Sequence, residues 1–133
     1  MLKYILLIFA IFTAGCAQKD CAETYSNYAN QFHLNFNSKD YESNYNWIKK
    51  YSGMDTSLGQ YLHDFEYIKQ KMGNFNNSKI KNINFDQVTS SGEKLIQVSY
   101  DSEFEKGDAK EFFYFGEKNQ FYRYELYSKN LLQ

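Results

Sequence analysis

The spacing of the hydrophobic residues changes once along this chain, near Lys81. Up to that point apolar side chains recur every three or four positions, as they do on the buried face of an amphipathic helix. Beyond it they alternate with polar residues, as in a half-buried strand. The chain is therefore predicted to place its helices first and its strands last, an order that favours an α+β domain over an alternating α/β one.

Three helices are predicted before residue 74. Asp20 and Glu23 have the spacing of a capping box, so the first helix is expected to begin near Cys21. Ser38 and Ser57 are the expected N-caps of the second and third helices. The side chains expected to face the core are Tyr25, Tyr28, Ala29, Phe32, Phe36, Tyr41, Tyr45, Ile48, Tyr51, Leu58, Tyr61, Leu62, Phe65, Ile68 and Met72.

Four strands are predicted to follow a polar loop at residues 74–78. Turn signals at residues 90–93, 105–108 and 116–119 separate them, so we expect a meander in which each strand pairs with the next. Because residues directly opposite each other share a face, four-residue loops would collect the apolar side chains on one side of the sheet. That predicted face contains Ile83, Phe85, Ile96, Val98, Tyr100, Phe113, Phe115, Tyr122, Tyr124 and Leu126.

The register that follows from these loops places Val98 opposite both Phe85 and Phe115. It also places Phe113 opposite Tyr122. One apolar face needs cover, and the helices are the elements available to supply it. The predicted fold class is thus α+β, with N-terminal helices packed on one face of a four-stranded antiparallel meander sheet.

The predicted sheet carries the stretch Tyr100-Asp101-Ser102-Glu103-Phe104, then a glycine turn, then Glu111 before an aromatic strand and a closing tyrosine. Together with three helices followed by four strands over Cys21 to Ser128, this resembles the superfamily named after nuclear transport factor 2, also called cystatin-like. Small bacterial envelope lipoproteins of unknown function often have this shape. The resemblance implies a cystatin-like fold over most of the chain after the N-terminal segment.

The N-terminal segment has the pattern of an export signal. Lys3 precedes an apolar run from Tyr4 to Ala14, which is too short to cross a bilayer, since crossing takes about 20 apolar residues. The run ends in Ala14-Gly15-Cys16, which resembles the lipobox of bacterial lipoproteins. The resemblance implies cleavage before Cys16 and acylation of its thiol with palmitate or a similar chain, so that a membrane lipid anchor holds the protein. A plain signal peptide is the main alternative, and a buried N-terminal helix is the third.

These signals divide the chain into a signal peptide at residues 1–15, a lipidated tether at residues 16–20 and a single α+β domain at residues 21–133. Ala17 follows the cysteine, which resembles the pattern that releases Gram-negative lipoproteins to the outer membrane, facing the periplasm. Acylation of Cys16 would leave Cys21 as an odd thiol, either unpaired or in an intermolecular disulfide.

Glu111 is the one carboxylate that interrupts the predicted apolar face, and the expected register places it near Ser102 and Tyr124. With Tyr100 these residues form the speculative ligand-binding set. A carboxylate among aromatic rings could act as a general acid or base. The structural alternative is a carboxylate at the open end of the sheet that accepts hydrogen bonds from tyrosine hydroxyls or helix ends.

The sequence lacks the motifs of several other kinds of functional site. The formal net charge of −1, with both signs interspersed, excludes the basic stripe that nucleic acid requires. His33 and His63 have no ligands at zinc-site spacing, and no Gly-x-Ser-x-Gly or phosphate-binding glycine loop occurs. No catalytic residue, metal or cofactor is therefore predicted. Trp47 either anchors a partner or completes the core.

The sequence supports three functional hypotheses. The first is a lipid-anchored envelope protein that binds a protein, a peptide or a small apolar molecule without catalysis. The second is a small hydrolase or isomerase of the same scaffold that uses Glu111 in an aromatic pocket. The third is an immunity or inhibitor lipoprotein. The second hypothesis requires Glu111 to lie in a closed pocket within hydrogen-bond reach of another polar group, and it fails if Glu111 is open to bulk water.

Overall fold

A computed structural model of the protein describes residues 18–132, with side chains from residue 22 onward. The elements, in chain order, are α2 (Gln18–Asn37), α3 (Tyr41–Ser52), α4 (Leu58–Met72), β1 (Phe75–Val88), β2 (Lys94–Phe104), β3 (Gly107–Gly116), β4 (Phe121–Tyr127) and the short 3-10 helix η1 (Lys129–Leu132). The strands form one antiparallel sheet in the order β1-β2-β3-β4. The predicted α+β class, with helices packed against a four-stranded meander, is confirmed.

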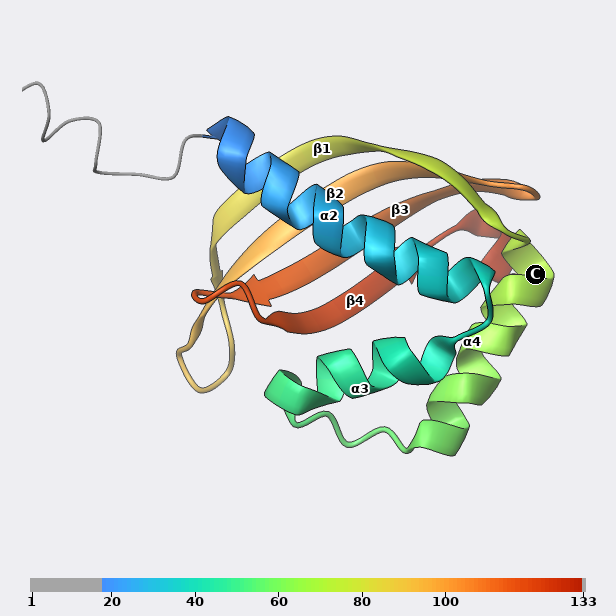
Figure 1. Ribbon diagram of the computed structural model, residues 1–133, viewed down its shortest axis with the longest axis horizontal. Helices are drawn as coiled ribbons and strands as arrows, with labels where there is room; N and C mark the ends of the chain where they lie inside the picture. The colour runs from blue at the N-terminus through green and yellow to red at the C-terminus, as the bar shows by residue number, and fades with distance from the viewer. Residues whose placement is uncertain (1–17, 133) are drawn as a thin grey trace, which may run out of the picture.

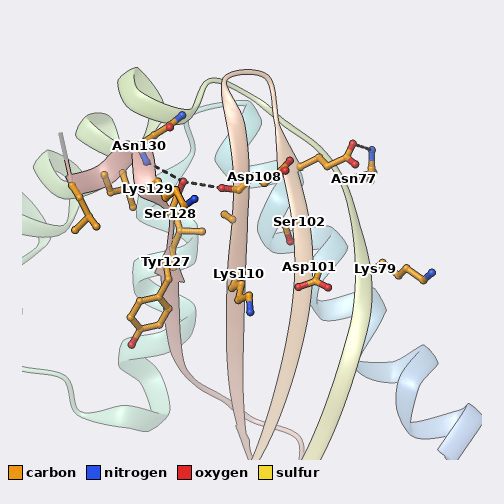
Figure 2. A pocket seen from close by; sticks show the side chains of 15 residues that line it. Asn77, Lys79, Asp101, Ser102, Asp108, Lys110, Tyr127, Ser128, Lys129 and Asn130 are labelled. Carbon is orange, nitrogen blue, oxygen red and sulfur yellow. Dashed lines mark hydrogen bonds between the residues drawn. The ribbon is translucent and has the colours of Figure 1, made fainter.

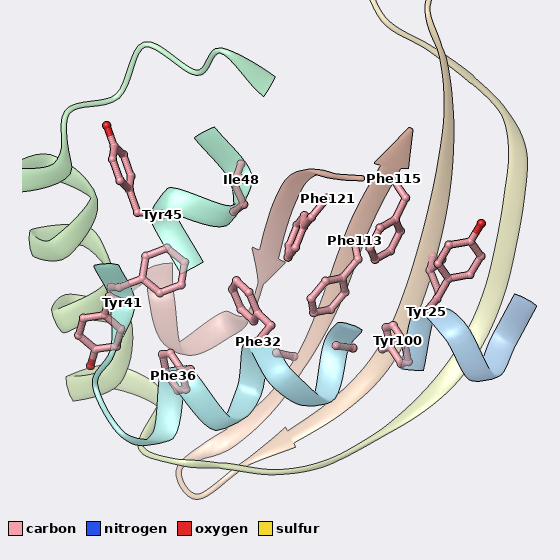
Figure 3. Packing of buried hydrophobic residues seen from close by; sticks show 14 of the residues in the cluster. Tyr25, Phe32, Phe36, Tyr41, Tyr45, Ile48, Tyr100, Phe113, Phe115 and Phe121 are labelled. Atoms are coloured by element: carbon pink, nitrogen blue, oxygen red, sulfur yellow. The ribbon is translucent and has the colours of Figure 1, made fainter. Parts of the chain in front are cut away.

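Aromatic side chains join the two layers. Helix α2 crosses one face of the sheet, and α3 and α4 lie beyond β4 (Figure 1). Phe32 of α2 meets the ring of Phe113 edge-on at 5.3 Å and lies 5.7 Å from the ring of Phe121. Figure 3 shows these rings converging between the helix and the strands. Offset and edge-on contacts of this kind add to the free energy gained by burying the rings.

Two of the three helices, α2 and α3, begin at a different residue or cap than predicted. Helix α2 already begins at Gln18, so Asp20 lies within its first turn. Helix α3 is capped by Asp40, whose carboxylate accepts from the Ser43 backbone N–H at 3.3 Å, and not by Ser38. Ser38 instead donates its N–H to the carbonyl of Leu34, which closes the preceding helix. The predicted cap at Ser57 is confirmed.

Strand β1 starts earlier than expected. Phe75 pairs with Phe104 of β2, so the predicted polar loop at residues 74–78 is wrong. The Asn37 side chain at the end of α2 explains why the strand starts at Phe75. Its Oδ1 accepts from the Phe75 N–H at 2.7 Å, and its Nδ2 donates to the Phe75 carbonyl at 2.9 Å. A helix end thus holds in place a strand that the local sequence does not indicate.

The register between β2, β3 and β4 differs from the prediction by two residues. Val98 pairs with Phe113, and Phe113 pairs with Tyr124. The turn after β2 is shorter than four residues, since Phe104 already pairs with Gly107. Because side chains alternate with a period of two, a two-residue shift by itself does not move a side chain to the other face. Val98, Tyr100, Phe113 and Phe115 are accordingly buried as predicted.

Three of the predicted inward side chains do not reach the core. Register shifts in β1 place Ile83 opposite Val98 and leave Phe85 51% exposed. A shift between β3 and β4 brings Phe121 inward, opposite Phe115, in place of Tyr122. Tyr51, in the last turn of α3, is also exposed. Bulges insert an unpaired residue and so reverse the side-chain alternation beyond them.

The end of α4 depends on a backbone conformation that only glycine tolerates well. Gly73 has φ 73° and ψ −161°, and a Cβ there would lie 2.8 Å from the Cβ of Glu105. Replacement of Gly73 with alanine should therefore destabilise the domain by about 1–3 kcal/mol in urea unfolding. Replacement of Gly59, whose Cβ would have open space within α4, should instead stabilise it by about 0.5–1 kcal/mol. Equal effects of the two changes would contradict this assignment.

Candidate functional site

A buried carboxylate lies at the centre of the sheet. Glu111 occupies the middle of β3, pairs with Tyr100 and Leu126, and has 0% of its surface exposed. Its position follows from alternation, since Glu111, Phe113 and Phe115 share the face that α2 covers. A carboxylate removed from water in this way needs hydrogen-bond donors to offset its lost hydration.

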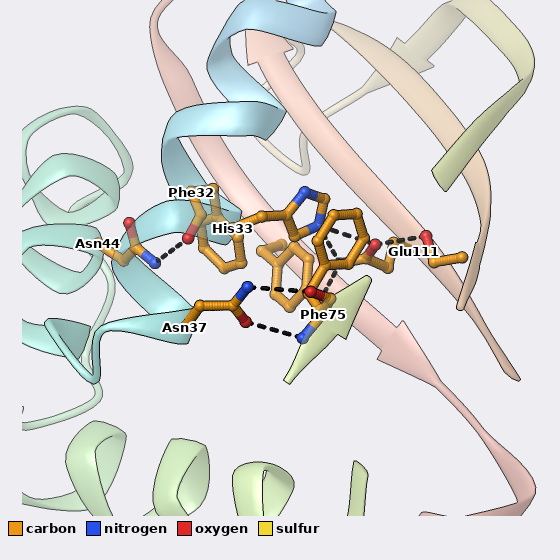
Figure 4. A network of polar contacts seen from close by, with 8 residues as sticks. Phe32, His33, Asn37, Asn44, Phe75 and Glu111 are labelled. Carbon is orange, nitrogen blue, oxygen red and sulfur yellow. Dashed lines mark hydrogen bonds and ion pairs between the residues drawn. The ribbon is translucent and has the colours of Figure 1, made fainter. Parts of the chain in front are cut away.

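Three side chains from three elements donate to this carboxylate. His33 Nε2 of α2 lies 2.9 Å from both Oε1 and Oε2 of Glu111. Ser102 of β2 donates its hydroxyl to Oε1, and Tyr124 of β4 donates its hydroxyl to Oε2, each at 2.5 Å. Figure 4 shows His33 and Glu111 at the centre of this network. Every oxygen of the carboxylate is thus bonded within the protein.

The ring of His33 is fixed by its neighbours. It stacks on Phe75 with ring centroids 3.5 Å apart and planes 6° apart, and it meets Phe113 edge-on at 5.7 Å. Because Nε2 faces two carboxylate oxygens, we assign its hydrogen to that nitrogen. The other ring nitrogen, Nδ1, is buried and has no hydrogen-bond partner among residues 18–132. The Asn37 bonds to the Phe75 backbone therefore also position the histidine, through the stacked ring.

The environment keeps Tyr124 in its protonated, donating form. Burial raises the pKa of Tyr124 well above its ordinary value of 10, and the charge and hydrogen bond of Glu111 raise it further. Burial likewise raises the pKa of Tyr100. At neutral pH both phenols are therefore neutral, and Tyr124 acts as a hydrogen-bond donor and not as a base.

The structure brings together three of the four residues proposed from the sequence. Glu111, Ser102 and Tyr124 are directly bonded, whereas Tyr100 is the backbone neighbour of Glu111 and packs its ring edge-on against Phe113 at 5.5 Å. Sequence reasoning weighs His33 only as a metal ligand and so misses its contact with Glu111. The available signal was its position four residues after Ala29 on the inner face of the helix, where a buried imidazole needs a polar partner.

The remaining candidates take ordinary positions. His63 is exposed on α4, and Trp47 packs edge-on against Phe121 at 4.9 Å, which makes it part of the core boundary. Within the described part of the chain, no group of three or more His, Cys, Asp or Glu side chains could hold a metal ion. The side chains of Cys16 and Cys21 lie outside the description, as does the predicted lipobox.

Two hollows lie near the buried network. The outer hollow, of about 960 Å³, lies along the β2–β3 end of the sheet and η1, where Asp101 and Lys110 project (Figure 2). Its charged lining is balanced, with three lysines and three acidic residues: Lys79, Lys110, Lys129, Asp101, Glu103 and Asp108. The α3–α4 hollow, of about 360 Å³, lies between α3, α4 and β4.

Each hollow borders one donor of the network and not its centre. Ser102 lines the outer hollow and Tyr124 lines the α3–α4 hollow, but neither hollow includes Glu111 or His33 in its walls. A substrate in either hollow would therefore have to displace a donor before it could reach the carboxylate. The arrangement can hold a charge in the core, and it offers the carboxylate no free approach from these two hollows.

Comparison of the chain with protein-family models, curated proteins and solved structures gave no match. Among residues 18–132, none of the helices is long and apolar enough to cross a membrane. The physical description of the site is thus the basis for assigning a function.

Proposed function

We propose that this protein is a lipid-anchored component of a bacterial cell envelope whose domain binds a ligand or partner without catalysing a reaction. The sequence supports the anchor through Lys3, the apolar run and Ala14-Gly15-Cys16. Acylated Cys16 would hold the domain at the membrane, and Ala17 favours the outer membrane, facing the periplasm, in a Gram-negative cell. Three helices against a four-stranded antiparallel sheet are compatible with the cystatin-like superfamily, to which we propose the domain belongs.

Glu111 lies within hydrogen-bond reach of other polar groups, as the enzyme hypothesis requires, but it lines neither of the two hollows, and this favours binding over catalysis. A general acid or base has to come within hydrogen-bond reach of the substrate atom from which it takes, or to which it gives, a proton. His33, Ser102 and Tyr124 already occupy the oxygens of Glu111, and the carboxylate has no exposed surface. The network therefore supports a role in joining α2 to three strands, while ligands would bind elsewhere on the domain.

The lipid anchor has a direct test, for which the chain offers a matched control. Cells fed labelled palmitate should incorporate the label into the wild-type protein and into Cys21→Ser, but not into Cys16→Ser. Cys16→Ser should also leave the membrane fraction, because it lacks the thiol that carries the lipid. Equal labelling of all three proteins, or of none, would overturn the anchor and leave a plain signal peptide.

A second candidate, an acid–base enzyme, is favoured by one observation: an imidazole, a phenol and a serine hydroxyl all bond one buried carboxylate. Such an enzyme would have to open the network on substrate binding. Turnover of a p-nitrophenyl ester above the buffer rate, lost in a folded Glu111→Gln variant, would favour this candidate. On the binding proposal, the wild type and Glu111→Gln give the same background rate.

A further inference from the structure

Two turns project from the same end of the sheet. Strand β2 begins at Lys94, which pairs with Val88 at the end of β1, and the next residue of β2 pairs with Gly116 at the end of β3. The β1–β2 loop (residues 89–93) and the β3–β4 turn (residues 117–120) therefore lie at one end of the domain, on the left in Figure 1.

Helix α2 starts at this end as well. The ring of Tyr25 stacks on Phe115 of β3 at 4.8 Å, and its hydroxyl donates to the Asn119 side chain in the β3–β4 turn at 3.1 Å. Helix α2 begins at Gln18, two residues after Cys16. Two residues span at most about 7 Å, so an acyl chain on Cys16 would hold the start of α2 close to the bilayer surface. We call the two turns and the start of α2 together the tether end.

Exposed apolar side chains lie at the tether end. Phe85 and Val88, near the end of β1, are 51% and 64% exposed, and Tyr51 in the last turn of α3 is 48% exposed. Trp47, one turn before Tyr51, packs 4.9 Å from Phe121 at the start of β4, so α3 also ends here. Rings and branched side chains left in water lose that unfavourable contact when they enter a lipid surface.

Exposure by itself does not select this end. The other large hydrophobic residues that are exposed among residues 18–132 lie towards the opposite end, and they are Leu34, Tyr67, Tyr127 and Leu132. Helix α2 has 20 residues and is therefore about 30 Å long, which separates the two ends. The short link to Cys16 decides which of them meets the membrane.

The β1–β2 loop holds its shape without a partner. Thr89 donates its N–H to the carbonyl of Glu93 at 2.8 Å, and its hydroxyl accepts from the Glu93 N–H at 3.0 Å. Gly92 donates its N–H to the carbonyl of Thr89 at 3.0 Å. Because these bonds already order the loop, insertion of the adjacent Val88 into lipid would cost little conformational entropy.

The tether end carries both signs of charge. Its exposed charged side chains are Lys49, Lys50, Lys94, Lys118, Glu23, Asp55, Asp86, Glu93 and Glu117. Without a basic patch, attraction to anionic lipid is not the driving force. The contact would depend on the apolar side chains, and the lysines can extend their charged groups to the lipid headgroups.

We propose that the tether end lies against the bilayer and that Phe85 and Val88 insert into its headgroup region, with Tyr51 at the same surface. This inference rests on the proposed lipid anchor and specifies a second contact with the membrane, for which zwitterionic lipid suffices. Tyrosine suits this position, since its ring is apolar and its hydroxyl polar. The outer hollow, at the opposite end of the sheet, would then face away from the membrane and stay open to a ligand.

The test measures membrane contact at two exposed positions of the full lipid-anchored chain, reconstituted in phosphatidylcholine vesicles that contain a nitroxide-headgroup lipid as quencher. In a Cys21→Ser background, a fluorescent dye is attached to Ser90→Cys in the β1–β2 loop or to Tyr127→Cys at the opposite end. Quenching should be at least about 3-fold stronger at position 90 than at position 127, because only the loop enters the headgroup layer.

A double variant tests which side chains make the contact. Replacement of both Phe85 and Val88 with serine should lower the quenching at position 90 by at least about 2-fold, since it removes the apolar surface that inserts. Leu34→Ser is the matched control, because Leu34 is as exposed as Val88, at 64%, but lies towards the opposite end. It should leave the quenching at position 90 unchanged.

Equal quenching at positions 90 and 127 would overturn the inference, as would a double variant that quenches like the wild type. Flotation of the protein with the vesicles reports the anchor separately. Protein that fails to float would contradict the proposed anchor and this inference with it. Protein that floats and is quenched equally at both positions would overturn this inference alone.

Discussion

Replacement of Glu111 with alanine should lower the free energy of unfolding by about 3–5 kcal/mol. The change removes the acceptor for three buried donors, His33, Ser102 and Tyr124, and leaves each without a partner in the core. It also opens a cavity beneath α2, since Glu111 has no exposed surface. Loss of one partner from a buried polar network costs more than the network contributes as a whole, because the remaining groups stay dehydrated.

Urea unfolding followed by circular dichroism measures this effect, and Glu125→Ala is the matched control. Glu125 lies on the neighbouring strand, on the opposite face, where it contacts the Arg123 side chain at 3.0 Å. Such a partly exposed pair contributes about 0.2–1 kcal/mol, so the control should remain close to the wild type. If Glu111→Ala unfolds at the same urea concentration as Glu125→Ala, the buried network does not stabilise the fold.

Replacement of Phe113 with alanine should cost about 3–5 kcal/mol. Phe113 has 0% of its surface exposed and meets rings from both layers, among them Phe32 at 5.3 Å, Tyr124 at 5.0 Å and Tyr100 at 5.5 Å. Removal of its ring would leave a void that these neighbours fill only in part. The unfolding midpoint in urea should fall accordingly, with the secondary structure kept under native conditions.

Phe85→Ala, compared with Phe113→Ala, tests the register of β1. Regular alternation with four-residue loops would place Phe85 in the core opposite Val98, whereas the structure exposes 51% of its surface. Its loss should therefore change the free energy of unfolding by less than about 1 kcal/mol. A cost for Phe85→Ala equal to that of Phe113→Ala would show that β1 keeps an unbroken alternation and that the observed register is wrong.

The sequence predicted those features that depend on local spacing. The change of period near Lys81 predicted the order of helices and strands, and the period of two placed Val98, Phe113 and Glu111 on one face. For these three residues the prediction survived a two-residue error in register, because an even shift does not change the face on which a side chain lies. For the same reason, the grouping of Glu111 with Ser102 and Tyr124 could be anticipated.

The tertiary structure alone decided the contacts between residues that are distant in the sequence. His33 and Glu111 are 78 residues apart, and Asn37 holds Phe75 across 38 residues, so no local pattern shows that either pair meets. The bulges in β1 that expose Phe85, and the lack of a partner for Tyr61 between two helices and β4, are likewise results of packing. Local spacing determines which way a side chain faces, whereas its contacts depend on how the layers fit together.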